Sequence, residues 1–322
     1  MAAQSEFDII ERYFSFSTAE ADIPLAIGDD AACIVSEKNP LVVATDSLLE
    51  GVHFPVDFPA EHVASRAMGV NLSDFAAMAA RPRWMTMALS LPALDDDWLA
   101  AFSQQLQRLC RQWGVVLIGG DTTCGPLSIT LTVIGHPAEQ HCLLRSGVAP
   151  SDDLWLSGPL GLAAAALSLL TTAQGEHWPL TETDRAALLS AFNTPQPRLE
   201  LSYHLAELAT AAIDISDGLL ADAGHLAEKS GVALCIDGDR LPIATALRQH
   251  PDRQQLRQWI LSGGDDYELL FTASPERRDE IAAIAAALQL PCQRIGVAEA
   301  GRGVQLSGDN WQRTTTEGYR HF

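Results

Sequence analysis

Aspartate recurs beside glycine, serine or threonine at five places where an apolar run ends. These segments are Gly28-Asp29-Asp30, Thr45-Asp46-Ser47, Gly119-Gly120-Asp121-Thr122, Asp214-Ile215-Ser216-Asp217-Gly218 and Gly263-Gly264-Asp265-Asp266. A sixth acid, Asp74, follows Asn71 by three residues in a helix-like run, so both side chains would lie on one helix face. Carboxylate oxygens are the ligands that Mg²⁺ takes in proteins, usually together with substrate phosphates.

This pattern fits metal-assisted phosphoryl transfer. That reaction needs positioning and neutralisation of phosphate charge rather than a protein nucleophile. Small neighbouring residues let a phosphate or a metal approach the backbone closely, and strand ends give the carboxylates a rigid support. The pattern therefore favours a site at which divalent cations hold a polyphosphate.

Each segment also has an ordinary structural interpretation. Aspartate beside glycine is typical of a turn, and Asp217 before a helix-like run could be an N-cap. Arg145 could be a surface residue or a bidentate phosphate ligand. The repetition of one local pattern, rather than any single segment, favours a shared ligand site.

The charge balance limits the possible partners. With 41 acids against 21 bases the formal net charge is −20, so the surface would repel nucleic acid and anionic lipid. A polyanionic ligand would need bound cations or a local arginine cluster. The lysines are Lys38 and Lys229, and neither lies in a Gly-x-x-x-x-Gly-Lys segment, which excludes a P-loop.

The cysteines and the start of the chain predict a cytoplasmic protein. None of the six cysteines forms a Cys-x-x-Cys pair, which indicates reduced thiols in a reducing compartment. Acids at Glu6, Asp8 and Glu11 are not typical of a signal peptide. The longest apolar run, 159–170, is too short to span a bilayer.

The elements that must position the acids alternate between β-like and helix-like runs, which predicts an α/β (α+β) protein of two domains, 1–142 and 143–322. The expected strands are 41–45, 86–91, 115–118, 127–135, 154–157, 211–215, 232–236 and 267–272. The expected helices are 59–80, 95–113, 217–230, 275–288 and an alanine- and leucine-rich run after Gly161.

Taken together and in order, the segments resemble those of thiamine-monophosphate kinases over nearly the whole chain. The matching stretches are Ile27 to Ala32, Thr45 to Leu48, Gly51 to Phe54, Asn71 to Asp74, Ile118 to Thr123, Arg145 to Gly147, Ile213 to Leu219, Ser262 to Leu269 and Gly318-Tyr319. The family belongs to a wider group of ATP-using enzymes that includes aminoimidazole ribonucleotide synthetase.

The resemblance implies a fold and an activity. It implies an N-terminal domain whose mixed sheet, with its helices, pairs with a second copy into a dimeric barrel, and a C-terminal α/β sandwich. It also implies a homodimeric kinase that uses several Mg²⁺ ions to transfer the γ-phosphoryl group of ATP to thiamine monophosphate. The products would be thiamine diphosphate and ADP.

Site residues carried over by the resemblance fall into three groups. The implied magnesium ligands are Asp30, Thr45, Asp46, Asp74, Asp121, Asp214 and Asp217. The implied nucleotide contacts are Gly120, Asp121, Arg145 and Ser216. The implied thiamine-phosphate contacts are His53, Asp265 and Tyr319. An aromatic Tyr319 could stack on a flat, cationic heterocycle.

Three positions depart from the family pattern. Ala44 stands where the family often has serine, Asp265 where it usually has glutamate, and Ala79 where glycine is common. Ala44 removes a hydroxyl that could bind metal, and the side chain of Asp265 is shorter than that of glutamate. None of these changes removes one of the expected metal-binding carboxylates.

Two other functions remain open on the sequence. One is a different ATP-dependent synthetase of the same fold, although Cys33 lacks the glycine-rich surroundings of the reactive cysteine in selenophosphate synthetases. The other is a non-catalytic acidic protein that binds divalent ions or senses a nucleotide. The sequence has no EF-hand loop, which counts against this second possibility.

Overall fold

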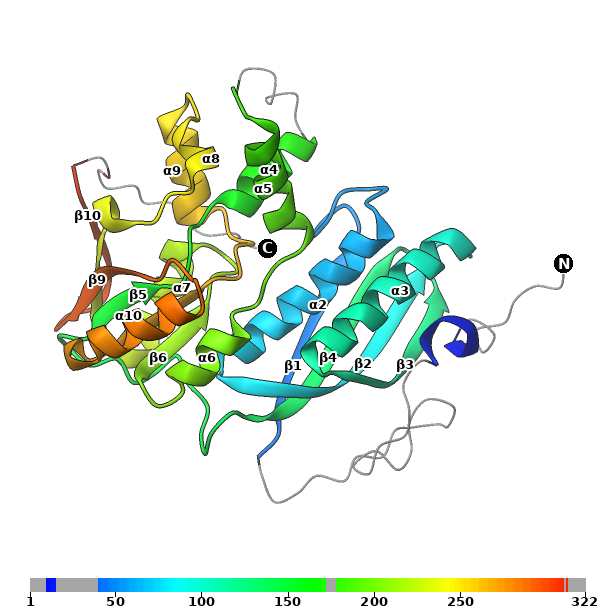
Figure 1. Ribbon diagram of the computed structural model, residues 1–322, viewed down its shortest axis with the longest axis horizontal. Coiled ribbons are helices and arrows are strands. Elements are labelled where there is room, and N and C mark those ends of the chain that lie inside the picture. The colour runs from blue at the N-terminus through cyan, green and yellow to red at the C-terminus, as the bar shows by residue number, and fades with distance from the viewer. Residues whose placement is uncertain (1–9, 16–39, 172–177, 310, 312–322) are drawn as a thin grey trace, which may run out of the picture. The chain divides into compact units, whose positions relative to one another are not determined.

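The computed structural model contains two compact units, each with a mixed sheet and helices, which confirms the predicted α/β class (Figure 1). The first unit comprises Met1–Phe75 and Arg81–Pro137, and the second comprises Ala76–Ala80 and Ala138–Phe322. The structure describes residues 10–15, 40–171, 178–309 and 311. None of the helices in these ranges combines the length and apolar character that a membrane crossing needs.

The first unit is built on a four-stranded sheet of order β1-β4-β2-β3. β1 pairs with β4 in antiparallel fashion, and β2 pairs with β3 in parallel, with a register shift between Met85 and Thr86. The strands are β1 (Val42–Leu49), β2 (Ala80–Leu91), β3 (Val116–Cys124) and β4 (Ser128–Pro137). The helical segments are η1 (Ile10–Phe14), α2 (Ala60–Ala77) and α3 (Asp96–Trp113).

Local signals in the sequence explain the limits of α3. Asp95 is its N-cap and accepts hydrogen bonds from the backbone N–H groups of Asp97 and Trp98. Gly114 ends the helix in the left-handed conformation, at φ 66°. Gln105 on α3 donates to Ser65 on α2 at 2.8 Å, so both helices lie against one face of the sheet (Figure 1).

The other face of this sheet carries exposed side chains on β1. Val43 and Leu49 are 59% and 42% exposed. Between them, the hydroxyl groups of Thr45 and Ser47 bond to hydroxyl groups on β4, at 2.9 and 2.7 Å. Because side chains alternate along a strand, these four exposed side chains of β1 lie on the face away from the helices, the open face of the sheet.

The second unit is built on a six-stranded mixed sheet of order β10-β7-β9-β5-β8-β6. Its strands are β5 (Asp153–Leu156), β6 (Ala209–Asp214), β7 (Ala233–Asp237), β8 (Leu269–Ala273), β9 (Gln293–Glu299) and β10 (Gly303–Ser307). Its helices are α4 (Leu162–Thr171), α5 (Glu182–Asn193), α6 (Leu199–Leu205), α7 (Leu219–Ser230), α8 (Thr245–Arg248), α9 (Arg253–Ser262) and α10 (Arg278–Ala287).

Several element bounds differ from the sequence prediction. β1 continues to Leu49 rather than ending at Thr45, because its backbone pairs with β4 over this whole length, and the hydroxyl groups of Thr45 and Ser47 also bond to β4. Gly119-Gly120-Asp121, expected between two strands, lies inside β3. β9 and β10 were not predicted, and α10 begins at Arg278 after a short 3₁₀ turn at Pro275–Arg277.

Candidate functional site

Asp46 and Asp74 form the acidic centre of the first unit. The backbone N–H of Asp46 on β1 donates to the side-chain oxygen of Asn71 on α2, at 3.1 Å. The carboxyl groups of Asp46 and Asp74 are themselves hydrogen-bonded. Burial raises the pKa of Asp46, and the hydrogen bond to Asp74 and the nearby His53 act against that rise. The predicted placement of Asn71 and Asp74 on one helix face is confirmed.

His53 lies beside this carboxyl pair. Its Nδ1 atom accepts a hydrogen bond from the backbone N–H of Leu49 at 3.0 Å, and its own carbonyl accepts one from Arg66 at 3.2 Å. The turn after β1 therefore holds the imidazole at the end of the strand that carries Asp46. Two carboxyl groups in contact need a proton or a cation between them, and their oxygens are the donor type that Mg²⁺ takes.

Asp121 does not join this pair within one copy of the chain. β1 and β3 are the two edges of the sheet, with two strands between them, which places the strand of Asp46 and the strand of Asp121 about 14 Å apart. Asp121 is exposed opposite Ala88, whereas the next residue, Thr122, is buried. Asp121 therefore points to the open face of the sheet, and Asp46 points to the helix-covered face.

The loop after β6 carries the acids of the second unit. Asp214 ends the strand and is 4% exposed, whereas Ser216 is exposed and Asp217 is half-buried. The N-cap of α7 is Gly218, with no side-chain cap, so the interpretation of Asp217 as an N-cap is wrong. A residue that was not predicted, Asp222 in the first turn of α7, binds this loop instead.

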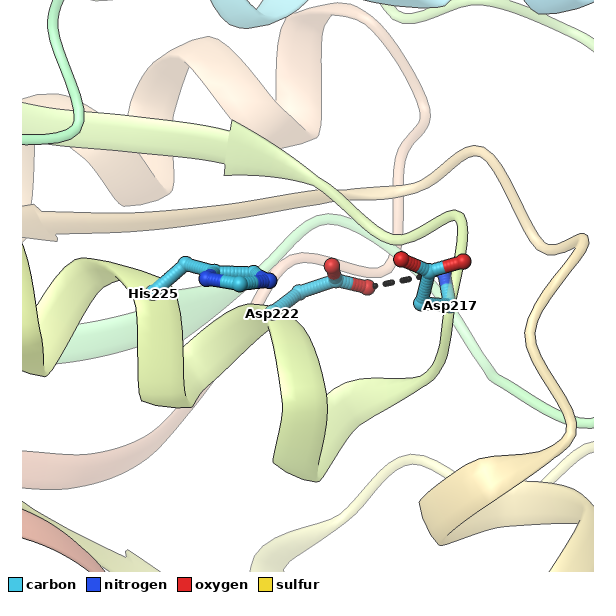
Figure 2. A group of neighbouring side chains, drawn as sticks. All are labelled: Asp217, Asp222 and His225. Carbon is cyan, nitrogen blue, oxygen red and sulfur yellow. Dashed lines mark hydrogen bonds between the residues drawn. The ribbon is translucent and has the colours of Figure 1, made fainter. Parts of the chain in front are cut away.

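Figure 2 shows Asp222 between Asp217 and His225. Potential ligand atoms of these side chains lie within 4.8 Å of one another. Burial, together with the charges of Asp214 and Asp217, raises the pKa of Asp222 to about 7. In the sequence, Asp222 is the one acid in an otherwise apolar first turn of α7. It was missed because the search for ligands was directed at acids beside glycine, serine or threonine.

The segment from Gly264 to Tyr267 lies against the loop after β6. The N–H of Asp265 donates to the carbonyl of Ser216 at 2.8 Å, and the N–H of Tyr267 donates to the carbonyl of Ile215 at 2.9 Å. Asp265 and Tyr267 have positive φ values of 63° and 53°, which non-glycine residues adopt at an energetic cost. Two sequence motifs far apart in the chain thus form one backbone-bonded structure.

The two adjacent acids of that segment differ in their surroundings. The carboxylate of Asp266 accepts hydrogen bonds from the N–H of Gly161, at 2.9 and 3.0 Å, just before α4. It therefore fixes the start of that helix. Asp265, predicted to contact the substrate, is half-buried and held through its backbone by Ser216.

Other predicted positions are less constrained. Arg145 is exposed, and its carbonyl accepts a hydrogen bond from Ser230 at 3.2 Å. Ala79 is buried with a φ of 47°, which explains why glycine would suit this position. Asp30 and Tyr319 lie outside the described residues.

Comparison with protein families gives a match to each half of the chain. Residues 28–136 match AIR synthase related protein, N-terminal domain, and residues 149–309 match AIR synthase related protein, C-terminal domain. Thiamine-monophosphate kinase of Salmonella typhimurium is 40% identical over 324 residues, which cover 99% of both chains. The Haemophilus influenzae enzyme of the same name is 39% identical and covers 91% of this chain and 89% of its own.

Solved structures agree with these matches. The crystal structure of thiamine-monophosphate kinase from Stenotrophomonas maltophilia superposes with a TM-score of 0.84 at 45% identity, covering 90% of this chain and 92% of the other. A structure described as AaThiL complexed with AMPPCP and TMP has a TM-score of 0.78 at 31% identity and covers 92% of both chains. The chain therefore belongs to the thiamine-monophosphate kinase family of the AIR synthase related proteins.

Proposed function

We propose that the chain is an ATP-dependent kinase that phosphorylates thiamine monophosphate, giving thiamine diphosphate and ADP. The observation that carries this proposal is the identity of 39–40% to thiamine-monophosphate kinases over nearly the whole chain. The relative described as AaThiL was solved with AMPPCP and TMP. The clustered carboxyl groups of both units are compatible with that chemistry.

Magnesium is the metal that suits the proposed site. Asp46 and Asp74 share a hydrogen bond, and Asp217 and Asp222 lie close to His225. Carboxylates dominate both groups, and such hard oxygen donors suit Mg²⁺. When bound, the metal neutralises phosphate charge. The proposed ligands are Asp30, Thr45, Asp46, Asp74, Asp121, Asp214 and Asp217.

The remaining proposed contacts orient the two substrates. Ser216 and Arg145 would hold the nucleotide with Gly120 and Asp121, and His53, Asp265 and Tyr319 would hold thiamine monophosphate. An oxygen of the acceptor phosphate would attack the γ-phosphorus in line, with ADP as the leaving group. The chain needs no covalent nucleophile for this reaction, so its task is positioning.

A homodimer is part of this proposal. On the open face of the sheet, β1 exposes the apolar side chains of Val43 and Leu49. Exposed apolar side chains on a sheet face suit contact with another sheet. Asp46 and Asp121 stand on opposite edges of one sheet. A barrel formed by two such sheets would bring the β3 edge of one copy, which carries Asp121, beside the β1 edge of the other copy, which carries Asp46.

We also propose that the enzyme works in the cytoplasm. Cys110, Cys124, Cys142, Cys235 and Cys292 are free thiols, which suits a reducing compartment. ATP as the phosphoryl donor is compatible with the same location.

An ADP-release assay with product analysis tests the activity. Purified protein is mixed with ATP and Mg²⁺, with and without thiamine monophosphate. We expect thiamine diphosphate and ADP in equal amounts, only when both substrates and Mg²⁺ are present. ADP formation that does not depend on thiamine monophosphate would favour another ATP-dependent synthetase, and nucleotide binding without any ADP would favour a sensor.

A further inference from the structure

Three backbone N–H groups converge on one oxygen atom of Asp222. The N–H groups of Ser216, Asp217 and Gly218 each lie 3.1 Å from its Oδ2 atom. Asp222 is only 2% exposed. Because these three hydrogen bonds end on one buried oxygen, the side chain of Asp222 constrains the backbone of the segment Ser216–Gly218 directly.

The same segment is fixed on its other side. Gly218 has a φ of 114°, and a side chain there would come within 2.8 Å of the Cα atom of Ser262. The carbonyl of Ser216 accepts the N–H of Asp265 at 2.8 Å. The carboxylate of Asp222 thus holds both the loop after β6 and, through Ser216, the segment that carries Asp265.

We propose that Asp222 is a positioning residue of the phosphoryl-transfer site, which holds Ser216–Gly218 in the conformation that presents the side chains of Ser216 and Asp217. This inference rests on the proposed kinase function, which assigns nucleotide and metal contacts to those two side chains.

The arrangement has a consequence for how the loop meets phosphate. Helix N-termini often bind phosphate through N–H groups that point at the ligand. Here the three N–H groups just before α7 are directed to Asp222. Ser216 would therefore contact the nucleotide through its hydroxyl group, and the loop as a whole presents carboxylates, which favour a cation.

Two substitutions at Asp222 test the proposal. Asp222→Ala removes the acceptor, whereas Asp222→Asn keeps one acceptor oxygen. Three quantities are measured in the full chain: hydrogen exchange at residues 216–218, the affinity for AMPPCP with Mg²⁺, and the Mg²⁺ concentration that gives half-maximal ADP release. We expect the alanine variant to exchange faster and to lose affinity for both ligands, each by more than tenfold. The asparagine variant should lie between it and the unmodified protein.

Asp252→Ala is the matched control. Asp252 also accepts two backbone N–H groups, at 2.8 and 3.1 Å, at the start of α9 in the same unit. We expect this variant to lower the unfolding temperature without changing the ligand affinities. If Asp222→Ala behaves in the same way, or if exchange at 216–218 does not change, the positioning role is wrong.

The remaining outcomes are also decisive. If Asp222→Ala does not fold, the asparagine variant alone decides. Unchanged hydrogen exchange at residues 216–218 and unchanged affinity for AMPPCP in that variant would overturn the proposal. If the unmodified protein binds AMPPCP but releases no ADP, only the kinase function fails, and exchange and affinity still decide the role of Asp222. If it binds no AMPPCP with Mg²⁺, both proposals are wrong.

Discussion

The side-chain amide of Asn71 joins helix α2 to the backbone of Asp46 on β1. Its oxygen accepts the Asp46 N–H at 3.1 Å, and its nitrogen donates to the carbonyl of Ala67 at 2.9 Å. Asn71 is completely buried. The position of the Asp46 carboxyl group relative to Asp74 therefore depends on a neutral amide one helical turn away.

We expect Asn71→Leu to lower the free energy of unfolding by about 2 kcal/mol, because it leaves the N–H of Asp46 without its partner. Asn71→Asp should also be destabilising, because it adds a third acid beside Asp46 and Asp74. Urea denaturation at neutral pH measures both effects. Gln104→Leu, which replaces an exposed amide on α3, is the control and should change stability by less than about 0.5 kcal/mol.

The proposed metal ligands on the two sheet edges should each be needed for turnover. We expect Asp46→Asn and Asp121→Asn to lower ADP release by at least roughly 100-fold, which corresponds to about 2.7 kcal/mol of barrier. Both changes keep the size of the side chain and remove its charge. Turnover like that of the unmodified protein, measured at limiting Mg²⁺, would show that the assignment is wrong.

Mixing these two variants shows whether a site is shared between copies. If Asp46 of one copy acts with Asp121 of the other, a mixed dimer contains one intact site and one doubly substituted site. We therefore expect refolded or subunit-exchanged mixtures to regain up to about half of the normal activity per mixed dimer. If each site uses its own copy only, the mixture stays as inactive as its components.

The sequence predicted local relationships better than distant ones. The spacing of Asn71 and Asp74 indicated one helix face, and both residues contact Asp46. That relationship depends only on helical geometry. The separation of Asp46 from Asp121 depends on strand order, which the pattern of apolar runs does not determine, so it could not be predicted.

Acids whose carboxylates bind backbone N–H groups could not be predicted from the sequence either, for a related reason. Asp222 and Asp266 are acids within the recognised segments or beside them, yet their carboxylates accept N–H groups from Ser216 and Gly161. Such contacts depend on how a loop curves back on its helix, and residue type alone does not reveal this. Conversely, Asp217 looked like an N-cap, but Gly218 takes that position.

Asp153 should make stability depend on pH in the acidic range. It is fully buried on β5, and it accepts hydrogen bonds from Arg278 at 2.8 Å and from Arg294 at 2.9 Å. Burial acts to raise its pKa, but the two arginines outweigh burial and hold the pKa below its usual value. The stabilisation is therefore complete above the unfolded pKa of about 4 and is lost as pH falls through the lower folded pKa.

We expect Asp153→Asn to lower the free energy of unfolding by about 3 kcal/mol at neutral pH, because it leaves two arginines without their anion. The difference from the unmodified protein should shrink as the pH falls below about 4. Urea denaturation across this pH range measures it. Asp279→Asn, at an exposed position of α10, is the control. A difference that stayed constant with pH would contradict the proposed role of the Asp153 charge.

Adjacent glycines on β3 should respond very differently to the same change. A Cβ atom at Gly120 would lie 1.8 Å from the carbonyl oxygen of Met87 on the neighbouring strand, whereas one at Gly119 would meet no atom within 4 Å. Gly120 also has a φ of 155°. We expect Gly120→Ala to cost at least about 2 kcal/mol of stability, since β2 and β3 must separate locally.

Gly119→Ala supplies the matched comparison, because it adds the same methyl group one residue earlier on the same strand. The stability of this variant should stay within about 1 kcal/mol of the unmodified protein, since the conformational freedom of glycine gives it no advantage over alanine inside a strand. Thermal unfolding of both variants measures the contrast. Equal losses would mean that the close approach of Gly120 to Met87 does not constrain this strand. A selective loss at Gly120 would show that the glycine beside Asp121 is fixed by packing between β2 and β3, whether or not it also contacts a nucleotide.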